Sequence, residues 1–494
     1  MKRFNMNKKI AALIAALLVA GVLAACSGNI ASSESSVSTT AEETTVASET
    51  SVSETSSDTT SAATSADDLV SDRDMDPSYD EESAVAITLN GDSATSSDSA
   101  GVTVEDGTVT ITAEGTYIIS GTLSDGQIVV DAGDEDKIQL VLRDCDITSS
   151  DSAPIYVKNA DKVFITLDAG SENTLTNVGA FEADGDTNID GIIFSKDDLT
   201  INGLGGLTIN TSDGNGIVCK DELVITGGSL MIDCSKSAIE ANDSIVITAG
   251  SITVTSCNDG LHAENDDDDT LGFIVISGGT FDITAADDGI HAVSTITIED
   301  GNITVTAAEA IEGTCVTING GTLSLTASDD GINAAQKSDS YTPTIEINGG
   351  DITIVMGEGD TDALDSNGNL IITGGTMDIT ATWPFDYDGT CEFTGGTITV
   401  NGSQVDTITN QFEGGPGGMD GQSGMGPGDG SMPDDFDPAD MGTPPDGFDP
   451  SNGGGGQPDG NPPEGFDASN FDPDAMPQGG APQGRPVDGG NGNS

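Results

Sequence analysis

The stretch Phe281–Gly301, FDITAADDGIHAVSTITIEDG, contains the pattern on which the fold depends. It begins with a short alternating apolar segment, passes through an Asp-Asp-Gly turn into an Ile-x-Ala segment, and continues into Ile-x-Ile before a closing Gly. Alternating apolar and polar residues are typical of β-strands, whose side chains point to opposite faces in turn. The stretch therefore predicts three short strands in one unit.

The same pattern recurs along most of the chain. Its middle strand begins at Ile217, Ile239, Leu261, Ile290, Ile311, Ile332, Leu364 and Phe385, with weaker copies at Ile128, Ile155 and Ile192. The full copies are separated by 22, 22, 29, 21, 21, 32 and 21 residues, so most units have one length and a few carry insertions. The third strand is closed by a glycine at Gly206, Gly228, Gly250, Gly279, Gly301, Gly321, Gly350, Gly375 and Gly396. The start of the middle strand and the closing glycine recur at matching intervals, which identifies a repeat architecture.

Three short strands cannot bury their apolar faces within one unit, and stacking of successive units solves this problem. The residues expected to point inward in the quoted unit are Ile290, Ala292, Ile296, Ile298, Ile303 and Val305. Their ladders, with backbone groups paired between coils, predict an all-β fold, a right-handed parallel β-helix of about ten to eleven coils. The leucine-rich-repeat pattern and helical periodicity are absent, so a leucine-rich solenoid is excluded. A β-sandwich stays open for the atypical first part only.

The N-terminus has the composition of a targeting segment. Residues 1–25 contain four basic residues followed by a short apolar run, as in a lipoprotein signal peptide. Cys26, directly after a small-residue site, is the predicted lipidation site, and an ordinary secretory signal is the alternative. We therefore expect a monomer on the extracellular face of the cell membrane, anchored only through the N-terminal lipid.

Composition divides the remaining chain into four segments. Residues 26–83 are rich in Ser, Thr and acidic residues and are expected to form a disordered stalk. Residues 84–126 are expected to form an N-terminal cap with the first coils, and residues 127–402 the β-helix itself. Residues 403–494, rich in Gly, Pro and Asp, are expected to form a disordered tail.

The charge balance limits the possible partners. The chain contains 84 acidic and 14 basic residues, a formal net charge of −70. Such a chain repels nucleic acids and anionic membrane surfaces, and it attracts cations or partners bridged by cations. Between Glu240 and Asn410 the only Lys or Arg is Lys337. We therefore exclude nucleic acid as a partner.

Acidic residues recur at two fixed places in the repeat. Two positions before the first apolar residue of the middle strand stand Asp259, Asp288, Glu309, Asp330 and Asp362. One position after it stand Glu240, His262, His291, Glu312, Asn333 and Asp365, which should face outward because side chains alternate. Rungs about 4.8 Å apart would make these charges repel unless cations intervene.

Calcium is the predicted cofactor, because it takes six to eight oxygen ligands and these turns are rich in carboxylates. The predicted metal ligands are Asp259, Glu264, Asp266, Asp287, Asp288, Glu312, Asp329, Asp330, Asp362 and Asp365. The acidic insertion that contains Glu264 and Asp266 is expected to add carboxylates to the same edge. Capping of Gly turns by Asp and Asn is the alternative, and it explains single Asp residues better than the pairs.

Aromatic residues offer a second kind of contact. Trp383 and Tyr387 near the last coils and Tyr341 in an insertion are the predicted carbohydrate-binding residues, since aromatic rings stack on sugars. Phe385 should point inward. The alternative is that the aromatic cluster closes the end of the β-helix.

The cysteines do not form a zinc pattern, because no C-x-x-C spacing occurs. Cys234 and Cys257 occupy comparable places in successive units, so a disulfide between them is conceivable.

A family resemblance follows from these stretches. The run ITLNGDSA from Ile87 and GVTVEDGTVTITAEGTYIISGTLSDGQIVVDA from Gly101, followed by units such as LVITGGSLMIDCSKSAIEANDSIVITAGSITV, resembles the carbohydrate-binding β-helix family of secreted bacterial proteins. The resemblance covers residues 84–402. It implies a polysaccharide-lyase-like β-helix with calcium in the acidic turns, which binds plant cell-wall glycans of pectic or cellulose-like type without established cleavage.

Two other functions stay open. A calcium-dependent lyase needs a base beside the calcium, usually Arg or Lys, and a β-helix hydrolase needs a spaced carboxylate pair. Asp287, Asp288 and His291 resemble part of the second arrangement, but the basic residues that would hold an anionic substrate are missing. A surface adhesin or spacer without a glycan ligand is the other alternative.

Overall fold

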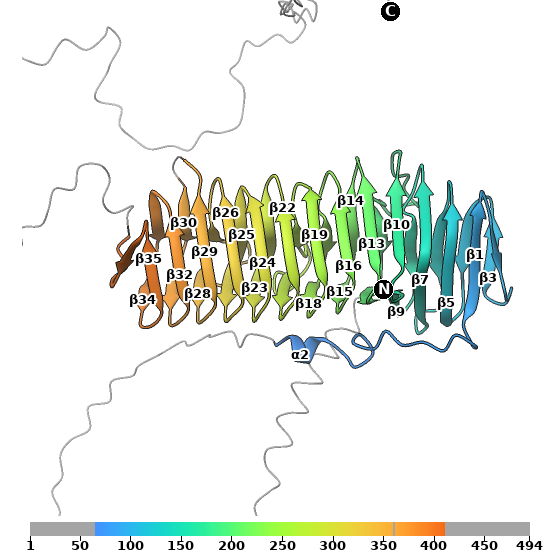
Figure 1. The fold of residues 1–494 in the computed structure, drawn as a ribbon, viewed down its shortest axis with the longest axis horizontal. Helices are drawn as coiled ribbons and strands as arrows, with labels where there is room; N and C mark the ends of the chain where they lie inside the picture. Colours follow the sequence, from blue (N-terminus) through green and yellow to red (C-terminus); the bar gives the residue numbers. More distant parts are fainter. Residues whose placement is uncertain (1–64, 359–360, 411–494) are drawn as a thin grey trace, which may run out of the picture. The chain divides into compact units, whose positions relative to one another are not determined.

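The computed structural model describes residues 65–358 and 361–410, and these form a parallel β-helix whose coils follow one another along a single axis (Figure 1). The predicted signal peptide, Cys26 and most of the predicted tail lie outside the described residues. Among the helices of the described part, none is long and apolar enough to cross a membrane.

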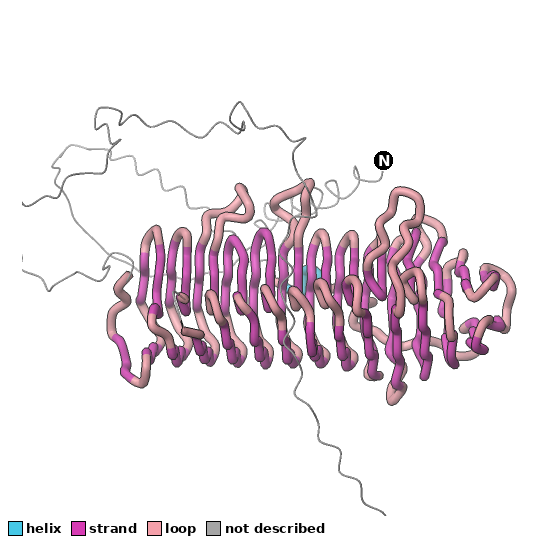
Figure 2. Tube along the Cα trace, turned by 90° about the horizontal axis from the view of Figure 1, so that it is seen from above, coloured by secondary structure: helices cyan, strands magenta, loops and turns pink. Residues whose placement is uncertain are grey.

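Each coil contributes one strand to each of three sheets, and the strands and turns of successive coils lie in register (Figure 2). The first sheet, which we call the ladder sheet, consists of β4 (Thr108–Ile111), β6 (Gln127–Asp131), β8 (Ile155–Asn159), β11 (Gly191–Ser195), β14 (Asn215–Cys219), β17 (Ile239–Ala241), β20 (Leu261–Ala263), the first parts of β23 (Asp288–Ile298) and β25 (Glu309–Ile318), β27 (Ile332–Ala334), β30 (Asp362–Ser366) and β33 (Trp383–Tyr387).

The second sheet consists of β1 (Val85–Gly91), β5 (Gly115–Leu123), the first part of β7 (Lys137–Ser149), β9 (Lys162–Leu167), β12 (Asp198–Gly203), β15 (Glu222–Ile225), β18 (Ser244–Ile247), β21 (Phe273–Ile276), the last parts of β23 and β25, β28 (Thr344–Ile347), β31 (Asn369–Ile372) and β34 (Cys391–Phe393).

The third sheet consists of the last part of β7, β10 (Glu172–Asn177), β13 (Gly206–Thr211), β16 (Ser229–Asp233), β19 (Ser251–Ser256), β22 (Thr280–Thr284), β24 (Asn302–Ala307), β26 (Thr322–Ala327), β29 (Asp351–Met356), β32 (Thr376–Thr380) and β35 (Thr397–Val400). Eleven coils run from β6 to β35, which agrees with the predicted number.

The core lies between the three sheets. The six residues predicted to point inward in the unit around Ile290 are all fully buried, and the same is true of the matching positions above and below. Burying one such side chain stabilises the fold by about 1.5–3 kcal/mol, so each coil is stabilised chiefly by its neighbours. The prediction of a stacked β-helix is confirmed.

Both ends depart from the parallel repeat. At the N-terminal end β2 (Ala94–Ser96) pairs antiparallel with β1, and β3 (Val102–Glu105) pairs antiparallel with β4. At the other end β36 (Ser403–Val405) pairs antiparallel with β35. Short antiparallel strands cover the exposed edges of the end coils, which would otherwise offer unpaired backbone groups. The first residues predicted to belong to the tail are therefore part of the β-helix.

The segment 65–83, which we call the N-terminal strap, lies against the outer face of the second sheet. It contains α2 (Ala66–Leu69), drawn beside the middle coils in Figure 1. Ala66 packs in an apolar cluster with Val224, Val246 and Val275. Composition placed this segment in the disordered stalk, and that boundary is wrong.

Asp74 fastens the N-terminal strap. Its Oδ1 accepts hydrogen bonds from Thr200 Oγ1 at 2.5 Å and from Lys162 Nζ at 2.8 Å, and its side chain is 2% exposed. Burial opposes ionisation of this carboxyl, but the hydrogen bonds from Lys162 and Ser71 outweigh it and lower the pKa of Asp74. A few buried contacts thus order a stretch whose composition predicts disorder.

The cysteine pair suggested by the sequence does not form. Cys234 and Cys257 are both buried and both free. Burial raises the pKa of each thiol to about 12, so both behave as small apolar residues.

Candidate functional site

The outward residues of the ladder sheet form one continuous column. Parallel register places Glu240, His262, His291, Glu312, Asn333, Asp365 and Asp386 on successive rungs, and we call these residues the ladder. The repeat spacing predicted this column, and the register confirms it. Side chains on neighbouring rungs of a parallel sheet lie within contact distance, so each ladder residue between the two end residues faces two others.

The ladder has an apolar continuation on its N-terminal side. Tyr156, Phe194 and Val218 occupy the preceding rungs. They are buried in a small apolar cluster with Ile189, which belongs to the long connection between β10 and β11. That connection covers the apolar rungs, so the polar part of the column begins at Glu240.

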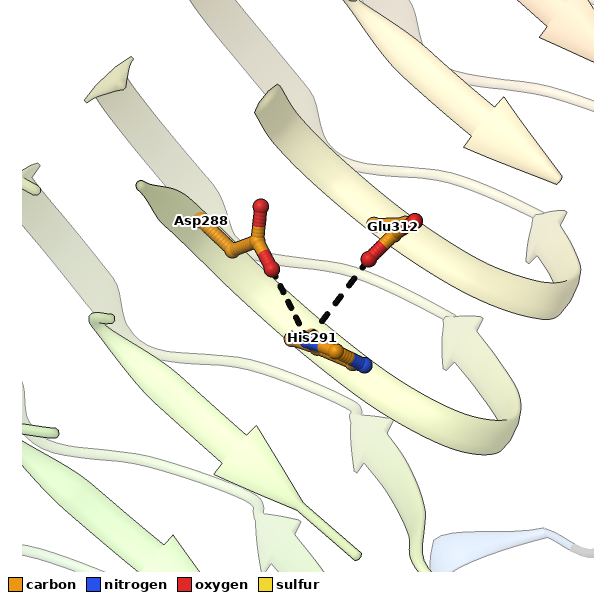
Figure 3. A group of neighbouring side chains, drawn as sticks. All are labelled: Asp288, His291 and Glu312. Atoms are coloured by element: carbon orange, nitrogen blue, oxygen red, sulfur yellow. Dashed lines mark hydrogen bonds and ion pairs between the residues drawn. The ribbon is translucent and has the colours of Figure 1, made fainter. Parts of the chain in front are cut away.

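Asp288, in the turn before the ladder, joins His291 and Glu312 of the ladder in one polar group. His291 Nδ1 lies 2.8 Å from Asp288 Oδ2 and 3.6 Å from Glu312 Oε2. Asp288 and His291 come from β23 and Glu312 from the next coil, and Figure 3 shows both carboxylates turned toward the imidazole. One ligand atom from each residue lies within 4.8 Å of the others, so the three could hold a metal ion.

Two further groups surround Glu312. Lys337 Nζ lies 2.7 Å from Glu312 Oε1, and Asn333 Nδ2 lies 3.0 Å from Glu309 Oε2. Burial, followed by the nearby charge of Glu312, raises the pKa of Glu309 to about 8. The region around Glu312 therefore concentrates carboxyl groups that repel one another.

His262 precedes the group on the ladder. Its Nδ1 lies 3.3 Å from Asp259 Oδ2 and its Nε2 lies 3.2 Å from Glu264 Oε2. Burial opposes protonation, but the bonds to the two carboxylates outweigh it and raise the pKa of His262. Its ring centroid is 4.7 Å from that of His291, so the two imidazoles are adjacent.

The C-terminal end of the ladder is purely acidic. Burial first, and then repulsion among Asp365, Asp329 and Glu312, raises the pKa of Asp330 to about 6. Burial and the nearby Asp386 and Asp362 raise the pKa of Asp365 to about 6 as well. Carboxylates that are crowded in this way repel one another when they ionise. A bound cation relieves that repulsion, so the group favours cation binding.

The acidic insertion does not lie where the repeat pattern placed it. Strand β20 ends at Ala263, so Glu264 and Asp266 follow the strand and lie at the edge opposite to Asp259 and Asp288. Asp269 from this insertion accepts hydrogen bonds from Ser338 and Ser340. The insertion therefore supports the loop that brings Lys337 to Glu312, and its Glu264 contacts His262 of the ladder.

Three of the remaining predicted metal ligands have exposed side chains. Asp287 and Asp329 are exposed neighbours of Asp288 and Asp330, and Asp266 is exposed in its loop. The structure therefore brings Asp288 and Glu312 together but leaves these three at the surface.

The predicted sugar-stacking residues do not form one platform. Trp383 is half-buried at the start of β33, in register with Asp362. Tyr387 stands in register with the inward Ser366 and is half-buried against the core, which agrees with the alternative that the aromatic cluster closes the end of the β-helix. Tyr341 lies in the loop after β27, at the opposite edge from Trp383.

Sequence reasoning missed three residues of this site. The repeat pattern predicts His291 and Asn333 on the ladder but not as metal ligands, and it predicts no role for Lys337. The spacing Asp-x-x-His in the Asp-Gly-Ile turn was an available signal, since it brings His291 Nδ1 within 2.8 Å of Asp288 Oδ2. The position of Lys337 depends on two insertions and had no signal in the repeat.

Parts of this chain are similar to known proteins. Residues 105–381 and 298–406 match the family described as carbohydrate-binding domain-containing protein. A carbohydrate-binding domain-containing protein from Acetivibrio thermocellus is 41% identical over 148 residues, which are 30% of this chain and 52% of that protein, so the match spans about half of the relative's length. A solved structure, that of the polysaccharide lyase-like protein from C. thermocellum as a gadolinium derivative, is 35% identical with a TM-score of 0.45, over 49% of this chain and 96% of that one.

The family match covers more than half of the chain and includes every rung of the ladder from Glu240 to Asp386. The chain belongs to the family of carbohydrate-binding domain-containing proteins.

Proposed function

We propose that this protein binds an acidic plant cell-wall polysaccharide of pectic type along the ladder, with calcium as the bridge and without cleaving it. The observation that carries the proposal is the crowding of carboxylates at the C-terminal end of the ladder. We further propose that the protein acts on the extracellular face of the membrane, anchored at Cys26.

Calcium fits the acidic end of the ladder. The donors around Asp330 and Asp365 are all oxygen atoms, and burial with mutual repulsion raises the pKa of both carboxyls to about 6. A divalent cation removes that repulsion, and calcium accepts several carboxylates together with backbone oxygens. Its remaining positions can accept the carboxylates of a uronate chain, which allows an acidic protein to bind an acidic polymer. The half-buried Trp383, in register with Asp362, would offer its ring to a sugar at this end.

Binding without cleavage is supported by the groups beside the ladder. Lys337 is the only Lys or Arg between Glu240 and Asn410, and its ammonium is paired with Glu312 at 2.7 Å. A β-elimination needs a base free to take a proton next to a uronate carboxylate. A paired, protonated lysine does not supply that base, and the pKa of Lys337 is raised by Glu312 in spite of burial.

The experiment is retention of the full-length protein on insoluble pectate and on cellulose, with calcium and then with a chelator. We expect retention on pectate that the chelator abolishes. The double variant Asp330→Asn/Asp365→Asn should lose retention, whereas Asp282→Asn/Asp378→Asn, which removes two exposed carboxylates from the third sheet, should keep it.

Retention on cellulose that the chelator does not change would contradict the calcium bridge and favour a neutral glucan as the ligand. Unsaturated products or new reducing ends in the pectate supernatant would contradict binding without catalysis. Loss of retention on both polymers in all conditions would favour an adhesin or spacer.

A further inference from the structure

The group Asp288, His291 and Glu312 differs chemically from the acidic end of the ladder, because it contains an imidazole. Calcium takes oxygen ligands almost without exception, whereas zinc and similar ions take imidazole nitrogen together with carboxylate oxygen. The presence of His291 Nδ1 between two carboxylates thus does not fit the calcium that the rest of the ladder favours. We infer that Asp288, His291 and Glu312 form a separate site for a divalent transition-metal ion of the zinc type.

The distances agree with one coordination sphere. Bonds of about 2.0–2.1 Å to a tetrahedral zinc ion place neighbouring ligand atoms roughly 3.3 Å apart. The observed separations from His291 Nδ1 are 2.8 Å to Asp288 Oδ2 and 3.6 Å to Glu312 Oε2, on either side of that value. A small movement of two side chains brings the three atoms into the sphere of one ion. Three protein ligands leave a fourth position for an oxygen of solvent or of a sugar.

The ligands are also held in place. The exposed fractions of the side chains of Asp288, His291 and Glu312 are 11%, 14% and 7%. The backbone N–H of Asp288 donates to Asp259 Oδ1 at 3.4 Å, and the β23–β25 register fixes His291 beside Glu312. Ligands that lie on stacked strands keep their spacing, which favours selective metal binding.

An unsatisfied buried carbonyl oxygen beside this group, Asn333 Oδ1, points to a missing partner. Among the described residues, four buried side-chain polar atoms have no hydrogen-bond partner, and two of them are His291 Nε2 and Asn333 Oδ1. Asn333 is 8% exposed, and its Nδ2 lies 3.5 Å from Glu312 Oε1. Buried carbonyl oxygens without a donor are rare and call for an ion or a water. A protonated His291 paired with the two carboxylates is the competing explanation of the contacts, and it leaves Asn333 Oδ1 without a donor.

This inference does not depend on glycan binding, and its test uses metal ions alone. Zn²⁺ is titrated calorimetrically into metal-free full-length protein in the presence of excess Ca²⁺ and physiological salt, which occupy the other carboxylates. We expect one Zn²⁺ site, weakened roughly 100-fold or more in His291→Gln because an inner ligand is lost. The matched control is His262→Gln, which removes the neighbouring imidazole of the ladder and should leave the affinity within about threefold, as expected of a residue outside the coordination sphere.

X-ray absorption at the zinc edge gives an independent readout. Scattering from an imidazole ring should be present in the wild-type complex and absent in His291→Gln, while Asp288→Asn should retain it with weaker binding. Equal melting temperatures of the metal-free variants in a chelator show that they are folded. Displacement of Zn²⁺ by Ca²⁺ at comparable concentrations, or equal losses in His262→Gln and His291→Gln, would overturn the inference.

Discussion

Asp221 is a carboxyl group outside the ladder whose ionisation is strongly disfavoured. It lies at the turn from the ladder sheet into the second sheet, where Asp198, Glu222 and Asp243 meet. Burial, and then repulsion by Asp198, raises the pKa of Asp221 to about 8, and the same causes raise the pKa of Glu222 to about 7. The folded state therefore holds protons that the unfolded chain releases.

The raised pKa of Asp221 makes the folding stability depend on pH. A carboxyl whose pKa is higher in the folded state contributes stability below its unfolded pKa of 3.8, and that stability is lost as the pH rises through about 8. The melting temperature should therefore fall between pH 5 and pH 8. Asp221→Asn should remove part of this fall and stabilise the protein at pH 8 by on the order of 2 kcal/mol.

Thermal unfolding at several pH values, at constant ionic strength, checks this prediction. Asp282→Asn removes one exposed carboxylate from β22 and serves as the control for net charge. A gain at pH 8 that is equal in both variants would assign the effect to overall charge rather than to the buried group.

The charge of Lys337 should affect metal binding at Glu312. Its ammonium competes with a cation for Glu312 Oε1, which it contacts at 2.7 Å. Lys337→Met keeps much of the side-chain length and removes the charge, so it should tighten Zn²⁺ binding by roughly tenfold, the effect of one close charge in a partly buried site. Calorimetry on the same metal-free protein measures this, and weaker binding in the variant would show that the lysine supports the site.

At the scale of elements, the N-terminal strap is an addition that the repeat does not require. Asp74 is its buried anchor, paired with Lys162 and Thr200 of the second sheet. Asp74→Ala leaves the Lys162 ammonium buried without its partner, which should destabilise the strap by about 3–5 kcal/mol. Limited proteolysis between residues 65 and 83 measures strap release, and urea unfolding measures the global effect.

The control for the strap is Asp72→Ala, which removes an exposed carboxylate two residues away. Rapid cleavage in both variants would show that the strap is loosely held in the wild type. Cleavage in neither would place the anchoring in the apolar cluster around Ala66.

The turns between coils make a matched prediction possible. Gly203 has φ +102°, and an added Cβ would lie 2.2 Å from Leu167 O in the coil before it. Gly170 has φ +80°, but a Cβ there would meet nothing within 4 Å. Gly203→Ala combines backbone strain with a backbone clash and should cost more than about 3 kcal/mol, whereas Gly170→Ala should cost about 1 kcal/mol. Chemical denaturation of the two variants compares them, and equal losses would mean that the coils can separate to admit a methyl group.

The repeat units were predictable because their signal is periodic. Strand positions, inward Ile and Ala residues and the outward ladder all follow from two spacings in the sequence, and the register confirms them. The N-terminal strap was not predictable, because its order depends on one buried ion pair and one apolar patch rather than on composition. The roles of Lys337 and Tyr387 depend on where loops and the last coil end, which a periodic pattern does not encode.

For the whole molecule, repulsion between negative charges is the main electrostatic term that opposes folding. A net charge of −70 opposes any compact state through self-repulsion, and the described coils stack part of this charge in columns. Monovalent salt screens charges beyond about 8–10 Å but does little for carboxylates on adjacent rungs. Ions that bind between the rungs should therefore stabilise the fold more than ions that only screen.

The corresponding prediction compares calcium with sodium at equal ionic strength. Calcium at 100 times its dissociation constant should stabilise the folded protein by about 2.7 kcal/mol, which raises the melting temperature by several degrees beyond the effect of sodium chloride. Asp330→Asn/Asp365→Asn should lose most of that difference, because it removes two carboxylates whose repulsion the ion relieves. Asp282→Asn/Asp378→Asn should keep it. Differential scanning calorimetry measures the melting temperatures of all three proteins. Identical shifts with calcium and with sodium would show that both ions only screen the ladder carboxylates and that no calcium ion is bound there. A calcium-specific shift that survives in the first double variant would instead place the stabilising ions in other turns of the stack.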